Sequence, residues 1–226
     1  MIRAVVFDLW NTLIHSRGGD PFRHLRALMT EAQRAQEPAF RREAMTTLDA
    51  DPEALLDRWA PRLGLSEEQR HAMIGVFRSA TEDAECFPEA CEALDATRRI
   101  ARVALLSNTQ RFGVEFLDRL GITERIPTRF LSAELGVLKP EPAAFEAVAR
   151  RLGLFPSQLA MVGDSWNDDV QGALQAGWTA LWLNRTGRPR PDHDPEAPLV
   201  EIQDLSQVPA IIQRLQAGAR CSTCLG

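Results

Sequence analysis

Four short segments of the sequence bring together residue types that could bind and transfer a charged group. Each segment follows an apolar run or begins a helical pattern, so its side chains would lie at one edge of a sheet. In chain order the candidates are Asp8, then Ser107, Asn108 and Thr109, then Lys139, and finally Asp164, Asp168 and Asp169.

The acidic residues are candidates for a cation site. An acid that ends a buried strand, as Asp8 does, is costly unless a metal ion or hydrogen-bond donors meet it. Three acids lie within the six residues 164–169, and neighbouring like charges raise one another's pKa unless a cation holds them. Carboxylate oxygens are ligands that suit Mg²⁺. A turn at Asp8 and an Asp-rich helix N-terminus at 168–169 would use the same residues without a metal.

The hydroxyl and basic residues are candidates for holding a phosphoryl group. Ser107 and Asn108 follow an apolar run, where a hydroxyl and a backbone N–H can bind a phosphoryl oxygen. A helix N-cap favours the same residue types. Lys139 is the only lysine among the 26 basic residues. A compact point charge used once, at the start of a helix, indicates a role that suits its geometry, although an arginine-biased composition would also leave few lysines.

The elements that must position these candidates alternate between apolar runs and amphipathic patterns. Strands are predicted over 2–7, 102–106, 158–162, 178–183 and 200–202. Helices are predicted over 88–99, 110–120, 141–152, 167–176 and 205–216. This alternation predicts an α/β fold in which a doubly wound parallel sheet has helices on both faces. Its active site would form beyond the carboxyl ends of the strands, where all four segments lie.

Two stretches interrupt the alternation. Residues 20–80 show helical patterns only, and a helical insert after the first strand would stand over the strand ends as a lid. Residues 184–198 are rich in Pro, Arg and Asp and are predicted to form a surface loop. We therefore expect a core of residues 1–14 and 87–216, an all-helical cap of residues 15–86, and a C-terminal tail of residues 217–226.

The composition is that of a globular protein without a marked affinity for polyanions. The 226 residues are 45% hydrophobic and 25% charged, with a formal net charge of −5. That charge argues against a nucleic-acid binder, and no apolar stretch approaches the length of a transmembrane helix. We expect a cytoplasmic protein, a monomer or homodimer, that binds neither nucleic acid nor a membrane.

The four cysteines, Cys86, Cys91, Cys221 and Cys224, do not define a site. The C-x-x-C formed by the last two can bind zinc only if two further ligands converge on it. We expect reduced thiols, with the terminal pair on a loose end of the chain.

In this order, the four segments resemble the signature motifs of the haloacid-dehalogenase-like hydrolase superfamily. VVFDLWNTLI, LLSNT, GVLKPEPAAF and VGDSWNDDVQGALQAGW look like its four motifs, and CFPEACEAL is similar to the return from its helical cap into its core. The resemblance covers residues 2–183 and, less closely, 199–216. It implies a Rossmannoid core, an inserted cap, and hydrolysis of a small phosphorylated metabolite.

The resemblance also implies a division of work among the candidate residues. Asp8 would be the nucleophile that forms an aspartyl-phosphate intermediate. Ser107, together with Asn108, would bind the transferring phosphoryl group. Lys139 would neutralise charge on the nucleophile and on the phosphate, so positioning and electrostatics would supply most of the rate.

The cofactor implied by the resemblance is Mg²⁺. Asp8 and Asp164 would bind it together with the main-chain carbonyl of Trp10. Asp169, or else Asp168, would support the water shell of the metal.

One position departs from the pattern of the family's phosphatases. They carry a second Asp two residues after the nucleophile, which protonates the leaving group and then deprotonates the attacking water. Here that residue is Trp10, whose indole N–H can donate a hydrogen bond but is neither a useful acid nor a base. General acid–base catalysis is worth about 10²–10⁴-fold. A phosphatase without it should be slow or select substrates with good leaving groups.

Two alternatives to a Mg²⁺-dependent phosphatase stay open. The family's 2-haloacid dehalogenases also lack the second Asp, because a halide leaves without a proton, and they need no metal. Asp164 and its trailing acids argue against that alternative. The other alternative is a catalytically weak binding protein that keeps the metal and phosphate sites but has lost turnover.

Overall fold

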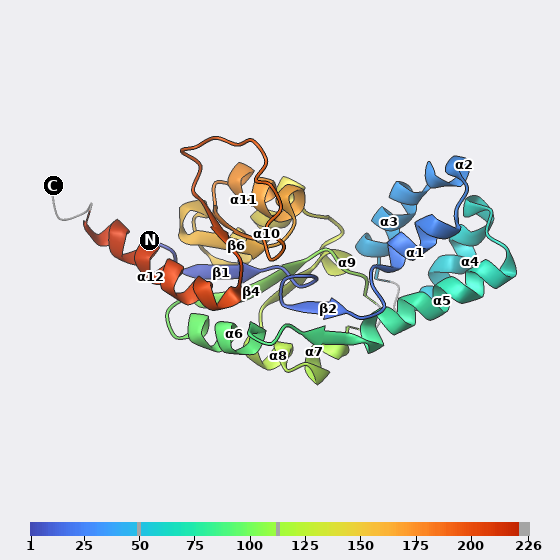
Figure 1. Cartoon of the computed structure of the whole chain (residues 1–226), viewed down its shortest axis with the longest axis horizontal. Helices are drawn as coiled ribbons and strands as arrows, with labels where there is room; N and C mark the ends of the chain where they lie inside the picture. Colours follow the sequence, from blue (N-terminus) through green and yellow to red (C-terminus); the bar gives the residue numbers. More distant parts are fainter. Residues whose placement is uncertain (49–50, 112–113, 222–226) are drawn as a thin grey trace.

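The computed structural model describes residues 1–48, 51–111 and 114–221. It has two parts joined by a pair of short strands (Figure 1). One part is a six-stranded parallel sheet with helices on both faces, which confirms the predicted doubly wound α/β core. In spatial order the strands are β5 (Arg129–Leu131), β4 (Arg102–Ser107), β1 (Ala4–Phe7), β6 (Leu159–Gly163), β7 (Thr179–Leu183) and β8 (Leu199–Ile202).

The central strand β1 shows why the sheet needs helices on both sides. Its side chains alternate between the two faces: Val5 and Phe7 enter one apolar cluster, and Ala4 and Val6 enter another, all fully buried. The first face is covered by α6 (Ala90–Arg98), α7 (Phe116–Arg119), α8 (Ile122–Arg125) and α12 (Val208–Cys221). The second face is covered by α10 (Pro142–Leu152), the π-helical turn Trp166–Gln171 and α11 (Gly172–Gln175). The strand is therefore held from both faces, and its carboxyl end has a fixed position.

The second part of the molecule is a group of helices with an apolar core of its own. Phe22, Phe40, Trp59 and Phe77 are buried and pack against one another with ring centroids 5.4–6.2 Å apart. The helices are α1 (Pro21–Leu28), α2 (Glu31–Arg34), α3 (Glu37–Thr46), α4 (Pro52–Leu63) and α5 (Glu67–Glu82). Figure 1 shows them as a lobe at the carboxyl ends of β1 and β4. We call this lobe the cap.

The chain enters and leaves the cap through a two-stranded antiparallel ribbon that the sequence did not reveal. Its strands are β2 (Ile14–Ser16) and β3 (Ala84–Cys86), with Ile14 opposite Cys86. Each strand has three residues, too few for a visible period, and they are far apart in the sequence. Most of the ribbon falls within residues 15–86, which were expected to be all-helical. The helices of the cap instead begin at Pro21 and end at Glu82. The expected domain boundaries stay a prediction.

Three other elements differ from the expectations. The short strand β5 was not predicted, because three residues that include an arginine carry no strand pattern. The helix expected over 110–120 is limited to α7 in the described residues, since Gln110 is buried and walls a cavity instead. The helix expected over 167–176 opens as a π-helical turn. Short 3₁₀ turns cover Pro156–Gln158 and Leu205–Gln207, and α9 covers Ser132–Leu135.

The C-terminal helix α12 extends to Cys221, beyond the end expected at residue 216. Cys224 lies outside the described residues, and the expectation for the terminal cysteine pair stays a prediction. Cys86 and Cys91 carry free thiols. No helix in the described part of the chain is long and apolar enough to cross a membrane.

Gly172 lies where α11 meets α10, and this contact tests the packing of the second face. A Cβ atom there would lie 2.5 Å from Cζ of Phe145 and 3.2 Å from Cα of Pro140. Since Phe145 is fully buried against Trp178, we expect Gly172→Ala to lower the free energy of unfolding by about 1–3 kcal/mol through overpacking. Urea unfolding followed by circular dichroism measures it.

The matched control is Gly75→Ala, at an exposed position of α5 where a Cβ would meet nothing within 4 Å. We expect it to be neutral or to stabilise by up to about 1 kcal/mol, because alanine is the better helix former. Equal losses for the two variants would contradict the close approach of α11 to α10.

Candidate active site

Asp8 lies directly after β1, at the carboxyl edge of the sheet. Its backbone N–H donates to the carbonyl of Val162 at 2.8 Å, so the residue continues the sheet pairing, and only 7% of it is exposed. The chain then turns sharply: Asn11 adopts φ +58°, a left-handed conformation that Asn tolerates better than most residues. The turn leaves the Asp8 carboxylate pointing into a cavity of about 520 Å³ between the sheet and the cap.

Lys139 bridges two of the predicted acids. Its Nζ lies 2.7 Å from Oδ1 of Asp8 and 2.6 Å from Oδ1 of Asp169, and only 4% of the residue is exposed. Burial lowers the pKa of Lys139, but the carboxylates of Asp169 and Asp8 outweigh it and hold that pKa above its usual value. The side chain is therefore an ammonium ion shared between two carboxylates.

The backbone of Lys139 is fixed by Asn108. The Lys139 N–H donates to Oδ1 of Asn108 at 2.8 Å, and Nδ2 of Asn108 donates to the Lys139 carbonyl at 2.9 Å. Asn108 was predicted to bind substrate, and it does line the cavity. Its amide is already engaged on both sides, so its direct effect in the structure is to position the lysine.

Asp169, and not its neighbour Asp168, joins the buried cluster. Oδ2 of Asp169 accepts from the N–H of Ser165 at 3.0 Å, while Oδ1 meets Lys139. A Cβ on Gly163 would lie 2.2 Å from Oδ2 of Asp169, so the strand can end this close to the carboxylate only with glycine. Asp168 lines the cavity and accepts from Asn167 instead.

The carboxylates of Asp8, Asp164 and Asp169 together form a possible cation site. Each offers an oxygen within 4.8 Å of the others. Burial, and next the charge of Asp8, raise the pKa of Asp164 to about 6. A cation would relieve this repulsion, and an all-oxygen donor set fits Mg²⁺ better than it fits softer metals. Since both oxygens of Asp169 already accept hydrogen bonds, Asp8 and Asp164 are the better placed direct ligands.

Ser107 lies at the end of β4 and is fully buried. Its Oγ has no hydrogen-bond partner among the described residues. A buried hydroxyl without a partner costs about 1–3 kcal/mol, which is consistent with a hydroxyl kept for an oxygen atom of a ligand.

Trp10 lies two residues after Asp8, and its indole is held by contacts with the protein. Nε1 donates to Oγ1 of Thr109 at 3.2 Å, and the ring packs on Phe116 with centroids 5.5 Å apart. The N–H of Thr109 donates to Oγ of Ser132 at 2.9 Å, and that hydroxyl donates to the carbonyl of Met45 in α3 at 2.6 Å. A chain of hydrogen bonds thus runs from residue 10 to the cap.

Basic residues at the rim of the cavity were not predicted. Arg188, from the loop after β7, donates to the carbonyl of Asp164 at 2.7 Å and lies 4.0 Å from its carboxylate. Arg42 of α3 forms a bidentate pair with Glu141, at 2.5 and 3.2 Å, and thereby joins the cap to the core. The sequence marked the loop 184–198 only as irregular. A signal for Arg188 would have been its position just beyond a strand end.

Comparisons of the sequence and of the fold with known proteins identify the family of this chain. A protein-family model described as haloacid dehalogenase-like hydrolase matches residues 2–177. Phosphoserine phosphatase of Thermus thermophilus is 38% identical over 152 residues, which are 64% of this chain but only 58% of that protein. (S)-2-haloacid dehalogenase 2 of a Pseudomonas species is 30% identical over 213 residues, 85% of this chain and 90% of that one. The solved 2-haloacid dehalogenase of Pseudomonas syringae has a TM-score of 0.64 at 26% identity and covers 95% of this chain and 99% of its own.

The raised pKa of Asp164 has a consequence for stability. In the unfolded chain this carboxyl ionises near its usual 3.8, whereas in the folded protein it does so at about 6. The charged carboxylate of Asp164 therefore lowers the free energy of unfolding. The full loss is present above pH 6 and disappears as the pH falls toward 4. We expect Asp164→Asn, measured by urea unfolding in EDTA, to stabilise the protein by up to about 3 kcal/mol at pH 8 and by less than about 1 kcal/mol near pH 4.

The control is Gly75→Ala at its exposed position in α5. Since it adds and removes no titratable group, its effect on stability should be the same at both pH values. A gain for Asp164→Asn that is the same at both pH values would show that its carboxylate is not destabilised by burial and by Asp8.

Proposed function

Since the chain belongs to the haloacid dehalogenase-like hydrolases, as its motifs led us to expect, we propose that it hydrolyses a small phosphate monoester through a phosphoryl group carried on Asp8. The observation that supports this most is the Lys139 ammonium held between Asp8 and Asp169, with Asp164 beside them. Such a site offers a nucleophile together with fixed positive charge for a dianionic phosphoryl group. The substrate we envisage is a small phosphorylated metabolite of the cytoplasm.

We propose Mg²⁺ as the cofactor. Asp8, Asp164 and the main-chain carbonyl of Trp10 would hold it, and Asp169 would support its water shell. When bound, the ion supplies charge neutralisation on the phosphoryl oxygens. This assignment gives each acid of the cluster a distinct partner: the metal for Asp164, Lys139 for Asp169, and both for Asp8.

In the first step a carboxylate oxygen of Asp8 attacks phosphorus, and the bond from phosphorus to the leaving oxygen breaks. Lys139 neutralises charge on the nucleophile and on the transferring group, while the otherwise unpartnered hydroxyl of Ser107 donates to a phosphoryl oxygen. In the second step water attacks phosphorus, the bond to Asp8 breaks, and inorganic phosphate leaves with the carboxylate restored. Positioning and fixed charge carry both steps.

Trp10 sets the limits of this reaction. Its indole cannot protonate the leaving oxygen or take a proton from water, and its N–H is occupied by Thr109. The leaving oxygen therefore departs as an anion, and the attacking water loses its proton to solvent. We expect slow turnover with alkyl phosphates and faster turnover with substrates whose leaving groups are weak bases.

Dehalogenation is the second candidate. Trp10 favours it, because a halide needs no proton, and a 2-haloacid dehalogenase is among the relatives that align over most of this chain. Asp164 weighs against it, because a metal-independent reaction gives no use to a third acid whose pKa is raised by burial and by Asp8. A weakly active binding protein with the same site is the third candidate.

The first test is steady-state hydrolysis of 4-nitrophenyl phosphate, whose leaving group departs without protonation. We expect activity with Mg²⁺ that is lost in EDTA and reduced at least about 10³-fold by Asp8→Asn, which keeps the shape of the side chain but removes the nucleophile. Activity that survives in EDTA, together with halide release from 2-chloropropionate, would instead support the dehalogenase.

A second test concerns Trp10 itself. Restoring an acid with Trp10→Asp should raise kcat/KM for alkyl phosphates by about 10²-fold or more, with little gain in kcat/KM for 4-nitrophenyl phosphate, because only alkyl leaving groups need a proton in the first step. Trp10→Asn is the matched control, since it removes the indole and its packing on Phe116 equally but adds no acid. Equal effects of the two variants on alkyl phosphates would rule out a missing proton donor as the cause of slow turnover.

A further inference from the structure

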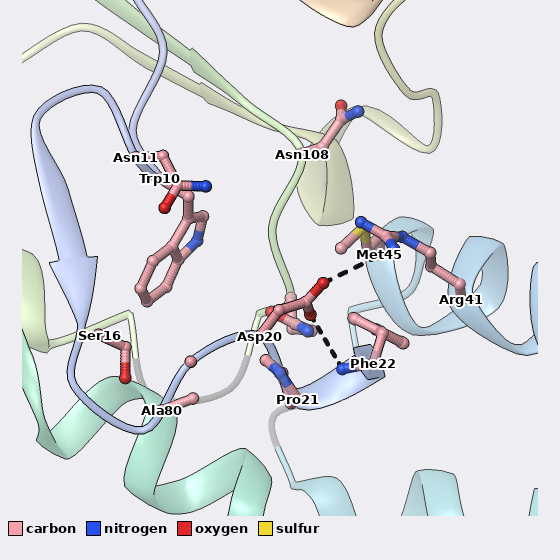
Figure 2. Close-up of a pocket in the computed structure, with 12 residues that line it drawn as sticks. Trp10, Asn11, Ser16, Asp20, Pro21, Phe22, Arg41, Met45, Ala80 and Asn108 are labelled. Carbon is pink, nitrogen blue, oxygen red and sulfur yellow. Dashed lines mark hydrogen bonds and ion pairs between the residues drawn. The ribbon is translucent and has the colours of Figure 1, made fainter. Parts of the chain in front are cut away.

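A second cavity opens from the candidate active site toward the cap. It has a volume of about 170 Å³, and both cavities are lined by Trp10, Asn11, Arg41, Met45 and Asn108. Figure 2 shows the indole of Trp10 on one side, the α3 side chains of Arg41 and Met45 across from it, and Ala80 of α5 near the ribbon. A group joined to phosphorus at Asp8 could therefore extend into this second cavity, which we call the inner chamber.

The size and walls of the inner chamber match one aromatic ring. The chamber measures about 170 Å³, close to the roughly 150 Å³ of an apolar cavity that admits benzene, although polar side chains such as Ser16 and Gln110 also line it. Trp10 offers an aromatic surface for offset or edge contact, and the thioether of Met45 is a favourable neighbour for a ring. A long or branched polar group would exceed this volume.

Among the described residues, the one carboxylate that lines the inner chamber is Asp20, and it is not placed to serve as the missing acid. Oδ1 of Asp20 accepts from the N–H of Phe22 at 2.9 Å as the N-cap of α1, and Oδ2 lies 3.9 Å from Arg41. Both oxygens are thus turned toward donors of the cap (Figure 2). Apart from Arg41, the other lining residues carry no titratable side chain.

A leaving group received here must depart as an oxyanion. Phenols ionise near pKa 10, whereas water, like an aliphatic alcohol, ionises near 15.7. A phenolate is therefore a far weaker base than an alkoxide, and it needs no proton to leave. The volume of the chamber, the indole in its wall and the lack of a suitably placed acid among the described lining residues all favour the same class of compound.

We propose that the inner chamber receives the aromatic ring of an aryl phosphate, so that the enzyme is selective for phosphate esters of phenols. This proposal rests on the proposed phosphatase function. In the reaction the P–O bond to the ring oxygen breaks as the bond to Asp8 forms, and the phenolate carries away the electron pair. Trp10 then provides a surface that binds the aromatic ring, and the phenolate leaving group needs no general acid at this position.

The experiment fills the chamber without touching the site around Asp8. Ala80 is 5% exposed and lines the inner chamber but not the catalytic cavity. We expect Ala80→Leu to lower kcat/KM for 4-nitrophenyl phosphate at least about tenfold, mainly through KM. For acetyl phosphate, whose P–O bond breaks to release acetate without protonation and whose small leaving group does not need the chamber, kcat/KM should change by less than about twofold.

Ala72→Leu is the matched control, since Ala72 lies on the exposed side of the same helix, and it should change neither substrate. Ala80→Val adds less volume and should give a smaller loss in the same direction if the leucine variant folds poorly. Equal losses for both substrates, or none for either, would overturn the chamber assignment while leaving the phosphatase function in place.

Phenol binding distinguishes a failure of the chamber assignment from a failure of the proposed phosphatase function. We expect calorimetric titration to detect phenol binding to the wild-type protein and to Asp8→Asn, and to detect none with Ala80→Leu. Phenol binding with this pattern in a protein that hydrolyses neither phosphate would refute the phosphatase function but keep the chamber as an aromatic site. Absence of phenol binding to the wild type would refute the chamber assignment.

Discussion

The buried ammonium of Lys139 is the interaction on which the rest of the site depends. One charge compensates two carboxylates, on Asp8 and Asp169, that come from different strand ends. Breaking a buried ion pair by removing one partner costs about 3–5 kcal/mol, so the three segments hold one another in place. The amide of Asn108 fixes the lysine backbone, and glycine at 163 leaves room for Asp169. The fold brings these strand ends together, and the Lys139 ammonium offsets the repulsion between the carboxylates of Asp8 and Asp169.

The replacement of an acid by Trp10 has a structural side as well as a chemical one. Its indole begins the chain of hydrogen bonds through Thr109 and Ser132 to the carbonyl of Met45. Position 10 therefore links the loop after Asp8 to helix α3 of the cap, which also carries the Arg42–Glu141 ion pair. Trp10 thus connects the core with the cap through hydrogen bonds and lines the inner chamber.

The sequence predicted what depends on local pattern and on spacing. The alternating strands and helices, and the positions of Asp8 and the 164–169 acids after strand ends, follow from periodicity and from the rule that parallel strands present their carboxyl ends at one edge. Lys139 was expected at the start of a helix, and it precedes α10. The preference for Asp169 over Asp168 came from the family resemblance and not from periodicity. The contact that separates the two is long-range: Asp169 is buried against Lys139, 30 residues away in the sequence. The β2–β3 ribbon and Arg188 were missed for a similar reason: both act through contacts between residues distant in the sequence, which no window along the chain records.

Mass spectrometry of the intact protein tests most directly whether Asp8 carries a phosphoryl group during the reaction. Without a base at position 10, hydrolysis of the intermediate should be slow, so the phosphorylated enzyme should accumulate. After rapid acid quenching of a reaction with 4-nitrophenyl phosphate and Mg²⁺, we expect the wild type to gain the mass of one phosphoryl group and Asp8→Asn to gain none. Nitrophenol release without this gain in mass, or an organic-acid ester formed from 2-chloropropionate in its place, would contradict the account.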